Sequence, residues 1–177
     1  MLIDKIKELS VANEDLKASR QAIVDIFIGK RMMLCKDFEM FFAKKNFEVT
    51  FNGEISCLSA KYHDLRLVLE YDRKVIENDE NLNFCLYSTG LLKEEFPRFE
   101  MVLYHPPYGN LPNLPDPANN TIQSKLDKIK TEISINRQKI EVLKDNDWHL
   151  KIRSSQHAGD YDTIFDFLRY YFEDTVE

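Results

Sequence analysis

The chain has 177 residues, of which 44% are hydrophobic and 31% are charged, and its net charge is −6. This composition predicts a folded domain with a hydrophobic core and excludes disorder over the whole length. No segment approaches the roughly eighteen apolar residues of a membrane-spanning helix. The first residues also lack the apolar run of a signal peptide.

Three cysteines, Cys35, Cys57 and Cys85, are spread through the chain without a CxxC pair. This odd number at wide spacing argues against a disulfide framework and against a zinc site. We therefore expect small buried thiols in a reduced, cytoplasmic setting, with no metal and no cofactor.

The charge is unevenly distributed, because residues 119–153 are net basic while 51–118 and 154–177 are net acidic. No segment carries the basic stripe that binding to nucleic-acid phosphates requires, and we expect neither a nucleic-acid nor a membrane partner. Nucleic-acid binding stays a second alternative, through the basic residues of one predicted helix, which are Lys125, Lys128, Lys130, Arg137, Lys139 and Lys144.

The first expected element is an N-terminal heptad helix over residues 2–28. One set of seam positions recurs every seven residues at Leu2, Leu9, Leu16 and Ile23. The other set comprises Ile6, Asn13, Arg20 and Phe27. Gly29 predicts a break or a bend after this helix.

Residues 31–104 are expected to form an α+β body. A short amphipathic helix over 31–45, with Met33, Phe38, Phe41 and Phe42 on its apolar side, precedes an antiparallel meander of about five strands. Turns are predicted at Asn52–Gly53, at His63–Asp64 and at 78–81. The strands are expected at 47–51, 54–62, 65–72, 82–88 and 98–104, and they are antiparallel because the gaps are too short for helical crossovers.

Five of the six prolines lie between Pro106 and Pro117, where strand alternation gives way to heptad spacing. Because proline ends strands and stiffens a connection, residues 105–120 are expected to form a rigid elbow. Exposed aromatic and proline side chains on a stiff loop also suit recognition, so the candidate binding residues here are Tyr104, His105, Pro106, Pro107 and Tyr108.

A second heptad helix is expected over residues 121–145, capped by Asn120 or Thr121. Its seam positions are Ile122, Leu126, Ile129, Ile133, Asn136, Ile140 and Leu143. The charges along its flanks disfavour a parallel homodimer of this helix, since Lys125 would face Lys130.

We expect the two heptad helices to pair antiparallel, within one chain or between chains. Setting Asn13 opposite Asn136 aligns apolar layers along most of both seams. A homodimer is the expected assembly. The candidate oligomer-interface residues are Leu9, Asn13, Leu16, Ile23, Leu126, Ile129, Ile133, Asn136 and Ile140.

The last region, 148–177, is expected to pack on the body or on a partner chain. It contains a strand over 148–155 and a closing helix over 161–173, with Asp160 and Asp162 as acidic N-terminal caps. Tyr170 and Tyr171 cannot both point inward, so they are further binding candidates. The whole chain is expected to be one domain with a helical arm.

The order of these elements resembles RWD-type domains of coiled-coil scaffold proteins. Tyr104, Pro106 and Pro107 stand where that family carries its Tyr-Pro turn, although His105 separates the tyrosine from the first proline. The resemblance covers about half of the chain and implies no function for it.

The expected function is a non-enzymatic protein–protein interaction module of adaptor, inhibitor or chaperone type. It would use the coiled-coil arm and an acidic, aromatic-containing surface, because no linear catalytic or phosphate-binding motif occurs. The alternative is an enzyme without such a motif, with His63, His105, His157 and Asp160 as acid–base or metal residues. That alternative predicts that at least two of these residues meet in one pocket.

Overall fold

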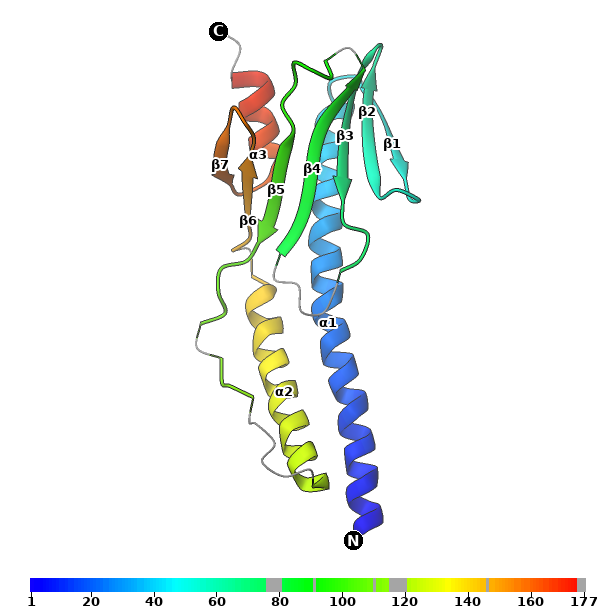
Figure 1. The fold of residues 1–177 in the computed structure, drawn as a ribbon, viewed down its shortest axis with the longest axis vertical. Helices are drawn as coiled ribbons and strands as arrows, with labels where there is room; N and C mark the ends of the chain where they lie inside the picture. The colour runs from blue at the N-terminus through cyan, green and yellow to red at the C-terminus, as the bar shows by residue number, and fades with distance from the viewer. Residues whose placement is uncertain (76–80, 91, 110, 115–120, 146, 175–177) are drawn as a thin grey trace. The chain divides into compact units, whose positions relative to one another are not determined.

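The computed structural model describes residues 1–75, 81–90, 92–109, 111–114, 121–145 and 147–174. The chain divides into a helical unit, residues 1–26 and 106–146, and a sheet unit, residues 27–105 and 147–177. Helix α1, Leu2–Ala43, contributes to both units (Figure 1). The expected α+β class with a β-meander is confirmed.

α1 continues through Gly29, so the predicted break there is wrong and the helices expected at 2–28 and 31–45 are one element. Glycine inside a helix costs only about 1 kcal/mol relative to alanine. Phe27, Leu34 and Phe38 on either side of this glycine are buried, and their burial outweighs that cost. Gly29 itself lies on the exposed side of the helix.

The described residues of the sheet unit form a seven-stranded antiparallel sheet whose strands follow one another in chain order. The strands are β1 Glu48–Asn52, β2 Cys57–Tyr62, β3 Leu65–Tyr71, β4 Asn81–Gly90, β5 Phe99–Tyr104, β6 His149–Arg153 and β7 Ala158–Tyr161. β7 was not predicted, because its four residues carry no apolar alternation.

Two of the three predicted turns are present, and the third, at 78–81, lies almost wholly outside the described residues. Asn52 Oδ1 accepts a hydrogen bond from the Glu54 backbone N–H at 3.0 Å, and β2 begins later than expected. Ser56 precedes β2 with a φ of 49°, in the left-handed region. In the second turn His63 has a φ of 51°, and the pairing of Tyr62 with Leu65 leaves two residues between the strands.

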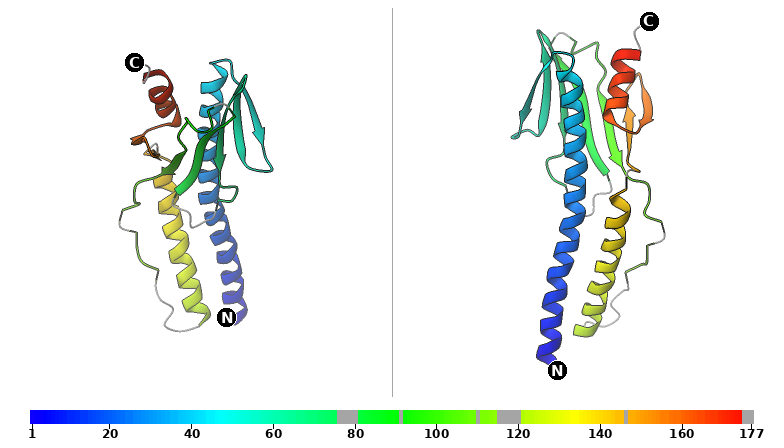
Figure 2. Two further views of the ribbon diagram at one scale, coloured as in Figure 1. Left: turned by 45° about the horizontal axis from the view of Figure 1, so that its top comes forward. Right: turned by 180° about the vertical axis from the view of Figure 1, so that it is seen from behind.

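Two helical segments cover the same face of the sheet (Figures 1 and 2). Phe41 of α1 lies 5.4 Å from Phe165 of α3, Ile164–Arg169, measured between ring centroids. Phe167 of α3 lies 5.1 Å from Phe99 of β5. These edge-to-face contacts join α1, α3 and the sheet in one aromatic core.

The closing helix is shorter than expected, because α3 passes at Arg169 into a π-helical turn, η1, Tyr170–Asp174. Its N-cap is Thr163, whose hydroxyl accepts a hydrogen bond from the Asp166 backbone N–H at 3.1 Å. The acidic caps predicted at Asp160 and Asp162 are therefore wrong. Asp160 belongs to β7 instead.

In the helical unit, α2, Ile122–Leu143, begins at the N-cap Thr121, which was one of the two residues predicted. α1 and α2 run in the same direction, so the antiparallel pairing predicted within one chain is wrong (Figure 1). Antiparallel pairing between chains stays a prediction. Glu8 pairs with Lys130 at 2.7 Å, and further along both helices Asn136 Nδ2 donates to Ser19 Oγ at 3.0 Å.

The Ser19–Asn136 bond joins residues 117 apart in number and fixes the register of the pair. The same offset places in common layers Leu9 with Leu126, Ala12 with Ile129, Leu16 with Ile133 and Ile23 with Ile140. Ala12 and Ser19 thus replace Asn13 and Arg20 as seam positions, and Asn13 is exposed.

The charged contacts fit this parallel register. The ion pairs Glu8–Lys130 and Glu132–Arg20 flank the seam. In each pair the glutamate directly precedes a seam residue of one helix, and the basic residue directly follows a seam residue of the other helix, as in parallel coiled coils. The Arg20 Nε lies 2.9 Å from the Glu132 carboxylate.

The proline-bearing connection is long enough for α2 to run parallel to α1. The Tyr108 ring lies 5.3 Å from Lys139 Nζ, near the end of α2, whereas Thr121 caps its start. Thirteen extended residues reach about 40 Å, and a helix of 22 residues spans about 33 Å. The connection is therefore long enough to return to the start of α2. Residues 110 and 115–120 of the predicted elbow lie outside the described residues.

Candidate functional site

The face of the sheet opposite α1 and α3 carries a row of polar side chains. The strand register aligns five of them across neighbouring strands: Cys57, Glu70, Cys85, Glu100 and Arg153. Along this row two thiols alternate with two carboxylates, and one guanidinium, that of Arg153, ends it.

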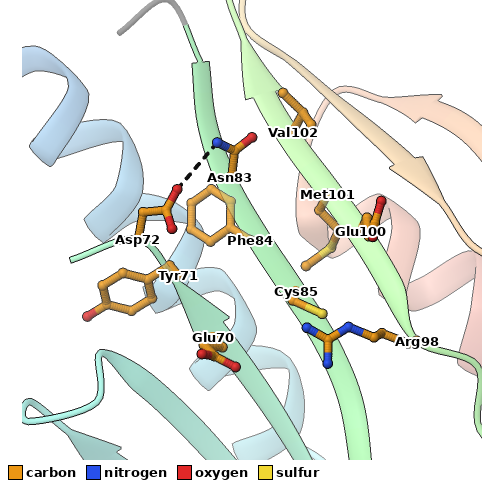
Figure 3. A pocket seen from close by; sticks show the side chains of 10 residues that line it. All are labelled: Glu70, Tyr71, Asp72, Asn83, Phe84, Cys85, Arg98, Glu100, Met101 and Val102. Carbon is orange, nitrogen blue, oxygen red and sulfur yellow. Dashed lines mark hydrogen bonds between the residues drawn. The ribbon is translucent and has the colours of Figure 1, made fainter. Parts of the chain in front are cut away.

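A hollow of about 360 Å³ lies on this open face, lined by residues of β3, β4 and β5 and by Arg98 (Figure 3). The Arg98 guanidinium lies beside Cys85 and 5.2 Å from the Tyr87 ring centroid. Burial raises the pKa of the Cys85 thiol, and Arg98 opposes that rise only in part. A raised pKa disfavours the thiolate form that a nucleophilic cysteine requires.

Burial also raises the pKa of the Tyr87 hydroxyl, and the neighbouring Glu70 carboxylate adds to the rise. On the other side of the hollow, Asn83 Nδ2 donates to the Asp72 carboxylate at 3.3 Å. This Asn83–Asp72 bond is the one drawn among the lining residues in Figure 3.

The residues of the enzymatic alternative are not brought together. His63 lies exposed in the turn between β2 and β3, and the His105 ring lies 5.5 Å from the Trp148 ring centroid. His157 Nε2 lies 2.7 Å from the Tyr161 hydroxyl, and Asp160 is exposed on β7. Within the described ranges, no three potential ligands are grouped so that they could hold a metal ion.

The predicted binding loop is shared between the two units. Tyr104 and His105 belong to the sheet unit, where Tyr104 faces His149 across the β5–β6 pair. Pro106, Pro107 and Tyr108 belong to the helical unit. Their predicted joint role in recognition stays a prediction.

Tyr170 and Tyr171 do not both point inward, as expected. Tyr171 is half-buried against Phe96 and Phe99, with a centroid distance of 4.9 Å to Phe99. Tyr170 is exposed and lies beside His157 and Tyr161. Tyr170 alone of the pair presents its ring to solvent.

The cations proposed for nucleic-acid binding have neighbours inside the helical unit. Lys130 pairs with Glu8, Lys144 pairs with Glu141 at 3.1 Å, and Lys139 lies over Tyr108. These contacts leave less free positive charge on α2 than the sequence suggests.

The sequence did not reveal a groove of about 510 Å³ between α1 and the β1–β2 hairpin. We name it the methionine groove; its lining residues are Ile28, Arg31, Met32, Met33, Cys35, Lys36, Glu39, Phe51, Leu58 and Tyr71. Three of its apolar side chains are largely exposed, at 65% for Met32, 61% for Met33 and 64% for Phe51.

The groove exists because α1 does not extend over β1, the edge strand of the sheet. Phe51, Leu58 and Leu69 are aligned across β1, β2 and β3 and share the face on which α1 packs. Leu58 and Leu69 are buried, but Phe51 is exposed. The apolar face of the sheet is thus wider than the helices that cover it.

The polar groups at the groove are of two kinds. Arg31 donates hydrogen bonds to the backbone oxygens of Asp72 and Arg73 and stacks on Tyr71. Burial raises the pKa of the Cys35 thiol to about 11, although Arg31 lowers it slightly. Lys36 and Glu39 are exposed and form no ion pair with any other residue that the structure describes.

Met33 was placed on the apolar side of this helix segment together with Phe38, Phe41 and Phe42. The three phenylalanines are buried, and the placement of Met33 among them is wrong. The signal available in the sequence was the Met32–Met33 pair, which widens the apolar arc of the helix beyond what one sheet face covers.

Comparisons with family models, curated proteins and solved structures found no match to this chain. Among the described helices, none is long and apolar enough to cross a membrane.

Proposed function

We propose that the protein is a non-enzymatic protein–protein interaction module that docks an apolar helix in the methionine groove. The observation that carries this proposal is the exposure of Met32, Met33 and Phe51 around one groove. At roughly 200 Å² per large side chain, they present on the order of 400 Å² of apolar surface. That is near the largest apolar patch of a typical monomer, and such patches mark interaction sites.

The chemistry of the groove favours a protein partner over a small molecule. Its lining combines flexible methionines with the Phe51 ring, which adapt to another apolar side chain. Arg31, Lys36 and Glu39 add charged groups to the same lining, and protein interfaces likewise combine apolar and charged residues. A helix lying along α1 would complete the layer of helices that covers the sheet.

The proposal differs in one respect from the function expected from sequence. The sequence favoured a coiled-coil arm and an acidic, aromatic-containing surface, whereas the contacts above favour the groove of the sheet unit. The adaptor, inhibitor or chaperone role and the cytoplasmic location remain predictions from composition.

The test is selection of helical peptides from a random displayed library against the full chain. Peptides that bind the groove should lose at least tenfold in affinity for Met33→Asp, since a carboxylate would be buried without a partner. They should keep their affinity for Val102→Asp, which places the same change on the open face of the sheet. Failure to select any peptide that discriminates the two variants would contradict the proposal.

A further inference from the structure

Strand β1 lies at the outer edge of the sheet (Figure 1). Among the described residues its only strand partner is β2, so one side of its backbone is unpaired. Such an edge is a template for a further strand, and folded proteins commonly block it with lysine, proline or a bulge. The sequence of β1, EVTFN, contains neither residue, and its register with β2 runs without a bulge.

The side chains along this edge are apolar on the face of the sheet that α1 covers elsewhere. Val49 and Phe51 lie on that face; Val49 is half-buried and Phe51 is exposed. At the opposite edge, Tyr161 of β7 lies on the same face, and its ring centroid is 5.4 Å from that of Phe167 in α3. The β1 edge therefore lacks the cover that α3 gives to the β7 edge.

The strand register shows which backbone groups of β1 point away from the sheet. β2 and β3 are joined by a two-residue turn, and the pair that closes such a turn, Tyr62–Leu65, is hydrogen-bonded. Bonding alternates along an antiparallel ladder, so the next residue of β2, Lys61, directs its backbone groups to its partner Glu48 in β1. By the same alternation, the N–H and C=O groups of Val49 and Phe51 point outward.

The sequence of β1 is complementary to itself when two copies run antiparallel about Thr50. Val49 then lies opposite Phe51 of the second copy, and Thr50 lies opposite Thr50. Pairs of a β-branched and an aromatic residue, and pairs of threonines, are among those that stabilise antiparallel strands. The one charged residue of β1, Glu48, lies opposite the neutral amide of Asn52.

We propose that β1 pairs with β1 of a second copy of this chain, antiparallel and with the two-fold axis at Thr50. The outward groups of Val49 and Phe51 then form about four backbone hydrogen bonds across the axis. Such a contact is isologous, because each copy contributes the same strand.

This inference goes beyond the proposed function, because it uses the backbone edge of the sheet; of the β1 residues, only Phe51 also lines the methionine groove. The self-complementary side chains favour a second copy over an unrelated extended peptide as the partner of the edge.

The first test measures the mass of the full chain by sedimentation velocity over a concentration series. We expect wild type to pass from the monomer of 20.9 kDa to a dimer. Thr50→Lys and Thr50→Glu should each raise the dissociation constant of the dimer by roughly tenfold or more, because each sets two like charges opposite one another at the axis. Thr50 is exposed, so the fold of one copy should tolerate both changes.

Mixing the two variants tests the axis itself. An equimolar mixture of Thr50→Lys and Thr50→Glu places opposite charges at the axis and should form a mixed dimer at concentrations where neither variant dimerises alone. Ala158→Lys, at an exposed position of β7, is the matched control and should dimerise as wild type does. A dimer that is insensitive to both Thr50 changes, or variants that the mixture does not restore, would overturn the proposed pairing.

A cross-link tests the register. Thr50 faces its own copy at a non-hydrogen-bonded position, where the two Cα atoms of an antiparallel pair lie about 4.5 Å apart, within the range of a disulfide. Mild oxidation of Thr50→Cys should therefore give a covalent dimer, whereas Ala158→Cys should give none above the wild-type background. Absence of this cross-link in a dimeric sample would overturn the axis at Thr50.

The outcomes separate this inference from the proposed function. Thr50 lies outside the lining of the methionine groove, so Thr50→Lys should leave the affinity of the selected helical peptides unchanged. A chain that stays monomeric at all concentrations but binds these peptides through Met33 would overturn the β1 pairing and leave the docking function intact. A chain that dimerises through Thr50 but selects no such peptide would overturn the docking function alone.

Discussion

The helical unit and the sheet unit are both built on α1, but different contacts specify them. In the helical unit a polar layer, Ser19–Asn136, and two flanking ion pairs fix the register of α1 against α2. In the sheet unit the contacts are aromatic. Its fully buried large residues include Phe27, Phe38, Phe41, Phe42, Phe99 and Phe167.

α1 is therefore positioned by two kinds of contact, polar ones in the helical unit and aromatic ones in the sheet unit. Apolar layers of a heptad pair tolerate shifted registers, so the helical unit depends on polar contacts for its specificity. The aromatic core of the sheet unit derives both its stability and its geometry from close packing. Substitutions in the two units should therefore have different kinds of effect.

The largest loss of stability is expected for Phe99→Ala. Phe99 is fully buried and contacts Phe96, Phe167 and Tyr171, so its removal leaves a cavity where β5 meets α3 and should cost about 3–5 kcal/mol. Urea unfolding followed by Trp148 fluorescence measures this cost. Phe51→Ala is the control and should cost less than about 1 kcal/mol, because its ring is exposed.

A smaller loss of stability, of about 1–3 kcal/mol, is expected for Asn136→Ala. The change removes the amide that donates a hydrogen bond to the Ser19 hydroxyl, at a seam position where Asn136 is only 7% exposed. Urea unfolding measures it by circular dichroism.

The double variant Ser19→Ala/Asn136→Leu separates stability from register. Replacing both polar partners by apolar ones should be nearly neutral in stability but should weaken the register. Disulfide formation between Leu9→Cys and Leu126→Cys reports the register, because these positions share a layer. A double variant that cross-links as efficiently as the parent would contradict a register set by the polar layer.

The N-caps compare the two units directly, since each has a threonine whose hydroxyl accepts a backbone N–H at 3.1 Å. Thr121→Ala and Thr163→Ala should each cost about 1 kcal/mol. Circular dichroism should show the loss as fraying of α2 for Thr121→Ala. For Thr163→Ala it should appear as a lower midpoint of the unfolding followed by Trp148 fluorescence. A lower fluorescence midpoint for Thr121→Ala together with fraying of α2 for Thr163→Ala would contradict these assignments of the two caps.

The smallest effect concerns pH. Burial raises the pKa of Cys35 from 9.0 to about 11, so the folded state favours the protonated thiol. The resulting stabilisation is present below about pH 9 and is lost as the pH rises through 11. Urea unfolding across this window should show a shallower fall for Cys35→Ala than for wild type. Equal slopes would contradict the assigned burial of the thiol.

Much of the fold followed from local patterns. Strand alternation predicted the meander, and Asn52–Gly53 and His63–Asp64 marked its turns because such residues accept tight turn geometry. Thr121 was predicted as a cap for the same kind of local reason. The seam of α2 was assigned correctly, and on α1 the positions of Leu9, Leu16 and Ile23 were also correct.

The rest depended on contacts between distant segments. Gly29 suggested a break, but tertiary burial of Phe27 and Leu34 decided that α1 continues. The direction of α2 follows from its contacts with α1, Glu8–Lys130 and Ser19–Asn136, and heptad spacing alone does not distinguish a parallel from an antiparallel pair. The methionine groove depended on how many strands α1 covers, and sequence periodicity does not predict that number.

The measurement that tests the docking surface most directly is the rate of methionine oxidation by dilute peroxide, read by mass spectrometry. Met101 is 1% exposed and Met1 fully exposed, so they give the slow and fast limits within the same chain. Met32 and Met33 should oxidise nearly as fast as Met1 in dilute protein. They should slow towards Met101 when a selected peptide binds. If they stay as fast as Met1 with the peptide bound, the methionine groove is not the docking surface.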